Sequence, residues 1–367
     1  MADEHYAFID DVDAAPDCPE PAVEEIPAWM DGSVRIGIHT SIAGDFTAAL
    51  DAAHKLGANA LQIFSASPRM WAGLSGGNRM ASAAAERFRA RRLELGLGPL
   101  VIHCNYLINL ASPDRMLRTK STQAFHEEIV RAVELGGDYL VLHPGSGRGA
   151  AAWDAITAIS EGLRQAARNV KMHGLRILLE NTAGQGSTVG ARFEELKAIL
   201  DACPELPLGI CMDTAHVFAA GYDVRTVEGL ERALRDIANT VGLERLFLVH
   251  ANDSKAPLAS HLDRHQHIGK GHIGLAGFRQ IVNHPLLAGR PFILETPIDA
   301  PGDDRRNVRT LWTLAGLQAK QAPPAANGFT MFRGERGGRA NRRARTARKS
   351  RSASRIKPRK QKKAGRK

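Results

Sequence analysis

Six short apolar runs in this chain each carry a potential metal ligand at or next to their end. The runs are LVIHC, LVLHP, ILLEN, GICMD, LFLVH and FILET, and the ligands are His103, His143, Glu180, Asp213, His250 and Glu295. Neighbouring ligands are 33 to 45 residues apart. A (β/α)8 barrel uses roughly 30 residues per strand–helix unit and gathers its functional groups at the carboxyl ends of the strands. The sequence therefore predicts a barrel that brings six imidazole and carboxylate groups to one mouth.

The order of elements agrees with this fold class, an α/β protein with a (β/α)8 TIM barrel. Eight nearly all-apolar segments are expected as strands, at 34–39, 60–64, 100–103, 139–143, 176–180, 208–213, 246–250 and 291–295. Amphipathic helices are expected between them, at 45–56, 81–95, 115–135, 150–173, 191–202, 227–241 and 305–321. Strands that alternate with helices favour a parallel sheet, and strands buried on both faces are apolar throughout.

The charge is divided unevenly along the chain, and this predicts three regions. Residues 1–32 contain ten Asp or Glu and no Lys or Arg, and we expect a disordered acidic extension there. Residues 33–321 form the expected barrel domain. Residues 322–367 hold 17 Lys or Arg against one Glu and are expected as a disordered basic tail. Such a tail either contacts the DNA backbone without sequence preference or serves solubility or targeting, and composition favours the two readings evenly.

Membrane and secretory roles are not expected from the sequence. No run of 18 apolar residues is present, so no membrane partner is predicted. The acidic first residues do not resemble a secretory signal. The four cysteines form no CxxC pair and are expected to be thiols in a reducing compartment.

Further candidate ligands lie in two segments that follow expected strands. His216 comes three residues after Asp213 in CMDTAHVFAAGYD, and Asp263 and His265 form a D-x-H pair in HLDRHQHIGKG. Zinc accepts imidazole nitrogen and carboxylate oxygen, and catalytic zinc sites leave one position open. Nine candidates exceed what one or two ions require, which indicates three metal ions. His39 is expected near the same mouth in a supporting role.

Several of these segments resemble the motifs of the endonuclease IV family. They are HCNYLINL, HPGS, ENTAGQGS, DTAHVFAAGYD, HANDSK and DRHQHIGKG, in the family's order and spacing. The resemblance extends from about Arg35 to about Gln318. Members of this family are zinc-dependent apurinic/apyrimidinic endonucleases of DNA base-excision repair.

The resemblance implies a site of three zinc ions, with manganese as an alternative at one of them. The first ion would be held by His103, His143 and Glu180. The second would be held by Glu180, Asp213, His250 and Glu295, with Glu180 bridging the first two ions. The third would be held by His216, Asp263 and His265.

The implied reaction is hydrolysis of the phosphodiester bond 5′ to an abasic site in double-stranded DNA. The products would be a 3′-hydroxyl and a 5′-deoxyribose phosphate, and removal of 3′ blocking groups is also expected. Glu180 and Glu295 would be the catalytic carboxylates. Arg69, Tyr106 and Leu107 match the residues with which the family enters damaged DNA, whereas Pro68 replaces a glutamine. The expected protein is a monomer, cytoplasmic and nucleoid-associated if bacterial and nuclear if eukaryotic.

Two alternative functions remain open at this point. A sugar isomerase or epimerase of the related barrel group would bind one divalent ion through Glu180, Asp213, His250 and Glu295. Such an enzyme has no use for the other five ligands as a set, so the metal count separates the two. A DNA-compacting or scaffold protein would act through the basic tail and would lose its function when the tail is removed.

Overall fold

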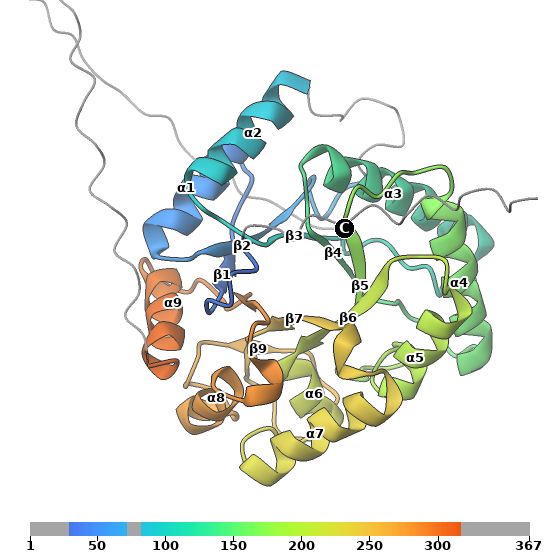
Figure 1. The fold of residues 1–367 in the computed structure, drawn as a ribbon. Coiled ribbons are helices and arrows are strands. Elements are labelled where there is room, and N and C mark those ends of the chain that lie inside the picture. The colour runs from blue at the N-terminus through green and yellow to red at the C-terminus, as the bar shows by residue number, and fades with distance from the viewer. Residues whose placement is uncertain (1–28, 72–81, 317–367) are drawn as a thin grey trace, which may run out of the picture. The chain divides into compact units, whose positions relative to one another are not determined.

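The computed structural model describes residues 29–71 and 82–316, and there eight parallel strands close into a barrel surrounded by helices (Figure 1). Around the barrel the strands follow the order β1, β10, β7, β6, β5, β4, β3, β2. Their bounds are β1 Ile36–His39, β2 Ala60–Phe64, β3 Leu100–His103, β4 Tyr139–Leu142, β5 Arg176–Glu180, β6 Leu208–Asp213, β7 Leu246–His250 and β10 Phe292–Leu294. The predicted fold class is confirmed.

Seven helices match the segments expected from the sequence. They are α1 Phe46–Leu56, α2 Ser82–Glu94, α3 Arg115–Glu134, α4 Ala152–Ala167, α5 Phe193–Ala202, α7 Val227–Thr240 and α9 Asp303–Leu314. The prediction for α4 was too long, because Arg168 leaves helical geometry at ψ 128° and Asn169 has a φ of 62°. The helix predicted to end at residue 321 ends at Leu314, and residues 317–321 lie outside the described part.

Several short elements were not expected from the sequence. They are α6 Thr214–Ala220, α8 Gly274–Val282, the 3-10 turns Leu243–Arg245 and Pro285–Leu287, and a hairpin of β8 Asp253–Ser254 with β9 His265–Gln266. Helix α6 starts immediately after β6, so no stretch of typical loop residues separates the two elements in the sequence. Asp213 caps this helix, because its side chain accepts a hydrogen bond from the backbone N–H of His216.

The core has one layer inside the barrel and one between the strands and the helices. The inner layer consists of Ala60, Val101, Tyr139, Val141, Leu178, Cys211, Leu248 and Ile293. Gly37 allows β1 and its neighbours to approach closely, since a Cβ there would lie 2.4 Å from Ile293 Cδ1 and 2.7 Å from the backbone of Ala60. The lumen is therefore filled with side chains, and the polar groups can gather only at its ends.

Within the described residues, contacts with the barrel start at Trp29, inside the segment predicted as an acidic extension. Its ring meets Tyr139 edge to face with centroids 6.1 Å apart, and its Nε1 donates to Asp138 Oδ1 at 3.1 Å. The remainder of the extension, residues 1–28, and the tail from residue 317 onward lie outside the described residues, so the predicted domain boundaries stay predictions. No helix in the described residues is long and apolar enough to span a bilayer.

Candidate metal centre

The polar side chains at the mouth lie directly above the apolar layer of the lumen. Residues two apart on a strand point to the same side. Leu178 and Glu180 on β5 show this spacing, as do Leu248 and His250 on β7. The same offset relates Ala60 to Gln62, Val101 to His103, Val141 to His143, Cys211 to Asp213 and Ile293 to Glu295. When the first residue of such a pair is buried in the lumen, the polar residue two positions further along the strand therefore lies at the mouth.

Glu180 lies at the centre of this group. Its side chain is fully buried, and Oε2 lies 3.3 Å from His103 Nε2 and 3.4 Å from His143 Nε2. Its other oxygen, Oε1, lies 3.1 Å from His250 Nδ1 and 3.3 Å from His216 Nδ1. One carboxylate thus meets imidazoles on both of its oxygens, as the bridging of two cations requires.

Two of the ligand sets predicted from the sequence come together as separate groups around Glu180. The ligand atoms of His103, His143 and Glu180 all lie within 4.8 Å of one another, and so do those of Glu180, Asp213, His250 and Glu295. Each group offers three or four nitrogen and oxygen donors, which is the number that zinc sites use. Their binding of metal stays a prediction.

The third predicted set lies beside Asp213. His216 Nε2 is 3.2 Å and His265 Nε2 is 3.5 Å from Asp263 Oδ1, and His265 Nε2 is 3.6 Å from Asp213 Oδ2. Both Nε2 atoms are buried without a hydrogen-bond partner. A buried polar atom without a partner costs about 1–3 kcal/mol. A cation among these side chains would satisfy both nitrogens, so the donors fit a bound metal.

Neighbouring carbonyl groups fix which ring nitrogen of three histidines faces the centre. The contacts join His103 Nδ1 to Cys104 O at 2.8 Å, His216 Nδ1 to Asn181 O at 3.0 Å, and His250 Nε2 to Gln62 Oε1 at 2.8 Å. A carbonyl oxygen only accepts, so the contacting nitrogen carries the hydrogen and the other nitrogen keeps its lone pair. The other nitrogen is the one that could bind a metal, and it faces Glu180 in His103 and His250 and Asp263 in His216.

The charges of the site also suit a divalent cation. Burial alone would raise the pKa of Glu180, but His143 and His250 outweigh it and hold that pKa well below its usual value. Glu295 shows the same balance, because His250 and a hydrogen bond with His39 keep its pKa low despite burial. Burial lowers the pKa of His143, whereas neighbouring anionic groups raise the pKa of His103, His216 and His250 against the effect of burial. A divalent cation bound here would replace the protons on these rings, because a metal ligand must be deprotonated.

Sequence reasoning missed two amides that hold the second group in place. Asn252 Nδ2 donates to Asp213 Oδ2 at 2.7 Å and to Glu295 Oε2 at 3.3 Å, while its Oδ1 accepts from the backbone N–H of Glu295 at 2.8 Å. Gln62 Nε2 donates to Glu295 Oε1 at 2.5 Å and lies 2.9 Å from His39 Nδ1. Gln62 was detectable, because it is the polar residue in the apolar run ALQIF.

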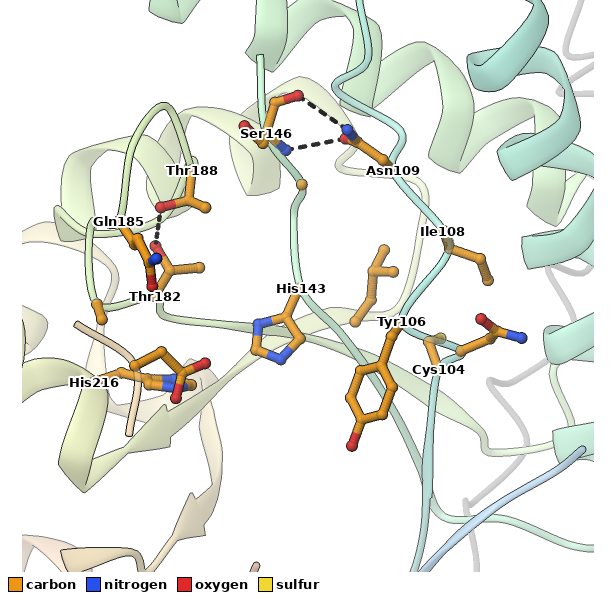
Figure 2. Close-up of a pocket in the computed structure, with 15 residues that line it drawn as sticks. Cys104, Tyr106, Ile108, Asn109, His143, Ser146, Thr182, Gln185, Thr188 and His216 are labelled. Carbon is orange, nitrogen blue, oxygen red and sulfur yellow. Dashed lines mark hydrogen bonds and ion pairs between the residues drawn. The ribbon is translucent and has the colours of Figure 1, made fainter. Parts of the chain in front are cut away.

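A cavity of about 490 Å³ adjoins the metal ligands. Figure 2 shows His143 between Tyr106 and His216 at the edge of this cavity. The facing wall is polar and includes Asn109, whose amide exchanges two hydrogen bonds of 3.0 Å with the backbone of Ser146 (Figure 2). The cavity is therefore large enough to hold a polar group the size of a sugar directly beside the metal ligands.

The predicted DNA contacts lie on two loops at the mouth. Arg69 is exposed on the loop that follows β2, and Leu107 is half-buried on the loop that follows β3. The Tyr106 side chain is 63% exposed, and its ring lies 5.2 Å from the Phe64 ring and 5.9 Å from the His103 ring. These side chains stand beside the site, and their contact with DNA stays a prediction.

The cysteines within the described residues are buried thiols, and we expect them to be inert. Burial raises the pKa of Cys104 well above its usual value and that of Cys211 to about 12. Cys203 is buried as well. A Cys18→Ser variant should therefore show no thiol that reacts with a disulfide reagent at pH 8 in the native state, and three after unfolding. Rapid native labelling of Cys104 would show that this residue is accessible at the mouth.

Comparison with known proteins defines the class of this barrel. Residues 50–314 match the family model described as xylose isomerase-like TIM barrel. The chain is 49% identical over 289 residues to probable endonuclease 4 of Solibacter usitatus, covering 77% of this chain and 97% of that protein. It is 43% identical over 265 residues to probable endonuclease 4 of Halothermothrix orenii, covering 72% and 94%. The protein therefore belongs to the xylose isomerase-like TIM barrels.

A solved structure narrows the class further. The crystal structure of endonuclease IV from Thermus thermophilus is similar to this chain with a TM-score of 0.68 and 40% identity, over 77% of this chain and 99% of that one. Within the barrel class, this chain belongs to the endonuclease IV family.

Proposed function

We propose that this protein is a metal-dependent apurinic/apyrimidinic endonuclease that repairs DNA. It hydrolyses the phosphodiester bond 5′ to an abasic site and leaves a 3′-hydroxyl and a 5′-deoxyribose phosphate, and it also removes blocking groups from 3′ ends. Membership of the endonuclease IV family supports the reaction class. The observation that carries the finer proposal is the convergence of nine ligand side chains in three adjoining groups, two of them sharing Glu180.

Three zinc ions, with manganese as an alternative at one, would bind at these groups. When bound, such ions supply a hydroxide at neutral pH and offset negative charge on the phosphate and on the departing oxygen. Glu180 keeps two of the positions together, because its oxygens face different histidines. Glu295 is held by Gln62 and Asn252 and orients the attacking water. Tyr106 and the polar wall around Asn109 enclose the sugar that carries no base.

The direct test is cleavage of a duplex that contains one tetrahydrofuran abasic analogue. We expect one cut immediately 5′ to the analogue, with a 3′-hydroxyl that a polymerase extends. A 3′-phosphate or a 3′-unsaturated aldehyde end would contradict the proposal, since those ends arise from other bond cleavages. An identical duplex without the lesion is the control and should stay intact.

The basic tail is proposed to contact the DNA backbone. Deletion of residues 323–367 removes 17 positive charges and none of the nine ligands. The slope of log affinity against log salt should become less steep by about 0.9 for each phosphate that the tail no longer neutralises. Turnover at saturating substrate and low salt should be unchanged. Binding measured across a salt series for both proteins decides the question, and equal slopes would show that the tail does not touch DNA.

A further inference from the structure

Asn105 ties together the two loops that carry the predicted DNA contacts. Its side chain is almost fully buried, and its Nδ2 donates to Ser67 O at 3.2 Å and to Met70 O at 2.5 Å. Its Oδ1 accepts from the backbone N–H of Leu107 at 2.7 Å. Because carbonyls only accept and the N–H only donates, the orientation of the amide is fixed. The two tethered carbonyls lie on either side of Arg69 in the sequence.

A buried ion pair on α3 supports the same two loops from beneath. Arg131 Nη2 lies 3.1 Å from Glu128 Oε1, and both side chains are buried. Arg131 Nε donates to Ser65 Oγ at 2.8 Å, and the Ser65 hydroxyl donates to Glu128. Burial raises the pKa of Glu128, and the nearby backbone N–H of Asn105 is among the groups that oppose this rise. The pair therefore contacts the loop after β2 through Ser65 and the loop after β3 through Asn105.

The residues of α3 that contact these loops lie on one face of the helix. Residues 120, 128 and 131 of a helix share a face, since 3.6 residues make one turn. Lys120 uses this face to place its Nζ 4.4 Å from the centre of the Trp71 ring. The loop after β2 is thus held at Ser65, at Ser67, at Met70 and at Trp71. The Arg69 side chain is exposed within this frame, as are those of Ser67 and Met70.

We propose that Asn105 is a positioning residue for lesion recognition that locks the Arg69 loop to the Tyr106 loop. The side chains of Arg69 and Tyr106 then enter DNA at an abasic site as one preformed wedge. Neither loop has to become ordered separately when DNA binds. Ordering a residue's backbone costs roughly 1–2 kcal/mol, so a frame built in advance favours the complex. This inference rests on the proposed function, and it adds the residues that set the protein's preference for damaged duplex.

The test variant is Asn105→Asp. The carboxylate still accepts from the N–H of Leu107, but it faces the carbonyls of Ser67 and Met70 with oxygens that cannot donate. Single-turnover cleavage of the tetrahydrofuran duplex is measured against enzyme concentration. We expect the concentration for half-maximal rate to rise about tenfold, because two buried hydrogen bonds are removed. The maximal rate, the bound metal and the inhibition constant of an intact duplex should stay within about twofold.

A double-variant cycle separates positioning from general stability. If Asn105 acts through Arg69, the Asn105→Asp change should have almost no further effect in an Arg69→Ala background. Ser160→Ala is the matched control, because Ser160 is a buried hydroxyl that donates to its own helix at Ile156 O. It should leave the half-maximal concentration unchanged. Asn105→Ser introduces no charge and should shift the value less, in the same direction, so the test does not depend on the Asp variant folding.

The outcomes distinguish this inference from the proposed function. A wild-type protein that fails to cut the abasic duplex overturns both. A wild-type protein that cuts, with Asn105 variants that match it, overturns the inference alone. An equal rise with and without Arg69, or a fall in bound metal, would show that Asn105 serves only the stability of the mouth.

Discussion

Replacement of either central carboxylate should abolish cleavage while leaving DNA binding largely intact. Glu180→Ala removes the side chain that meets four imidazoles, and Glu295→Ala removes one held by two amides. Metal-ion stabilisation is worth several kcal/mol, so we expect the single-turnover rate on abasic duplex to fall by about a thousandfold or more. Affinity for the same duplex should change little, because Arg69, Tyr106 and Leu107 remain in place.

The two variants should differ in their metal content. Glu180 belongs to two ligand groups, so Glu180→Ala should retain less metal than Glu295→Ala. The exposed Glu161 on α4 offers a control in Glu161→Ala, which should behave as the wild type. Circular dichroism confirms that each variant is folded. Wild-type turnover in a folded Glu180→Ala or Glu295→Ala protein would rule out the proposed centre.

Loss of the wedge side chains should weaken recognition of the lesion more than general DNA binding. Base–aromatic stacking contributes roughly 1–3 kcal/mol, so a Tyr106→Ala, Leu107→Ala double variant should bind abasic duplex about ten to a hundred times more weakly. Binding of intact duplex should fall far less, since it depends mainly on phosphate contacts. Arg69→Ala should act in the same direction, because Arg69 occupies the neighbouring loop.

The quantity to compare is the ratio of dissociation constants for intact and abasic duplex. Leu93→Ala provides the control, because Leu93 is 78% exposed near the end of α2, at the opposite end of the barrel wall from the mouth. An unchanged ratio in both wedge variants would mean that Arg69, Tyr106 and Leu107 are ordinary apolar and basic residues of the rim.

The sequence predicted the barrel and the meeting of the ligands because both follow from a local rule. An apolar run that ends in His, Asp or Glu combines strand burial with a polar residue at the carboxyl end, and the six runs share this pattern. Two strand ends differ by one residue, since β4 ends at Leu142 and β10 at Leu294, just before their ligands. Such shifts do not move the side chains to another face.

The supporting residues could not be predicted, because their roles depend on contacts between distant segments. Asn252 bridges Asp213 and Glu295, which are 39 and 43 residues away. Asn105 reaches back 35 residues to Met70. In the sequence, neither Asn105 nor Asn252 can be told apart from an ordinary asparagine in a loop. Helix α6 was not predicted for a similar reason. Its N-terminal cap is Asp213, which the sequence pattern assigns to the end of a strand.

The number of metal ions bound per chain tests the central claim most directly. Elemental analysis of the purified protein should give three ions for the wild type and two for a His216→Ala, His265→Ala double variant, because these residues belong only to the third group. Zinc should predominate, with manganese at no more than one position. A single ion in the wild type, with the same single ion in the double variant, would contradict the three-ion centre and favour a one-metal isomerase or epimerase.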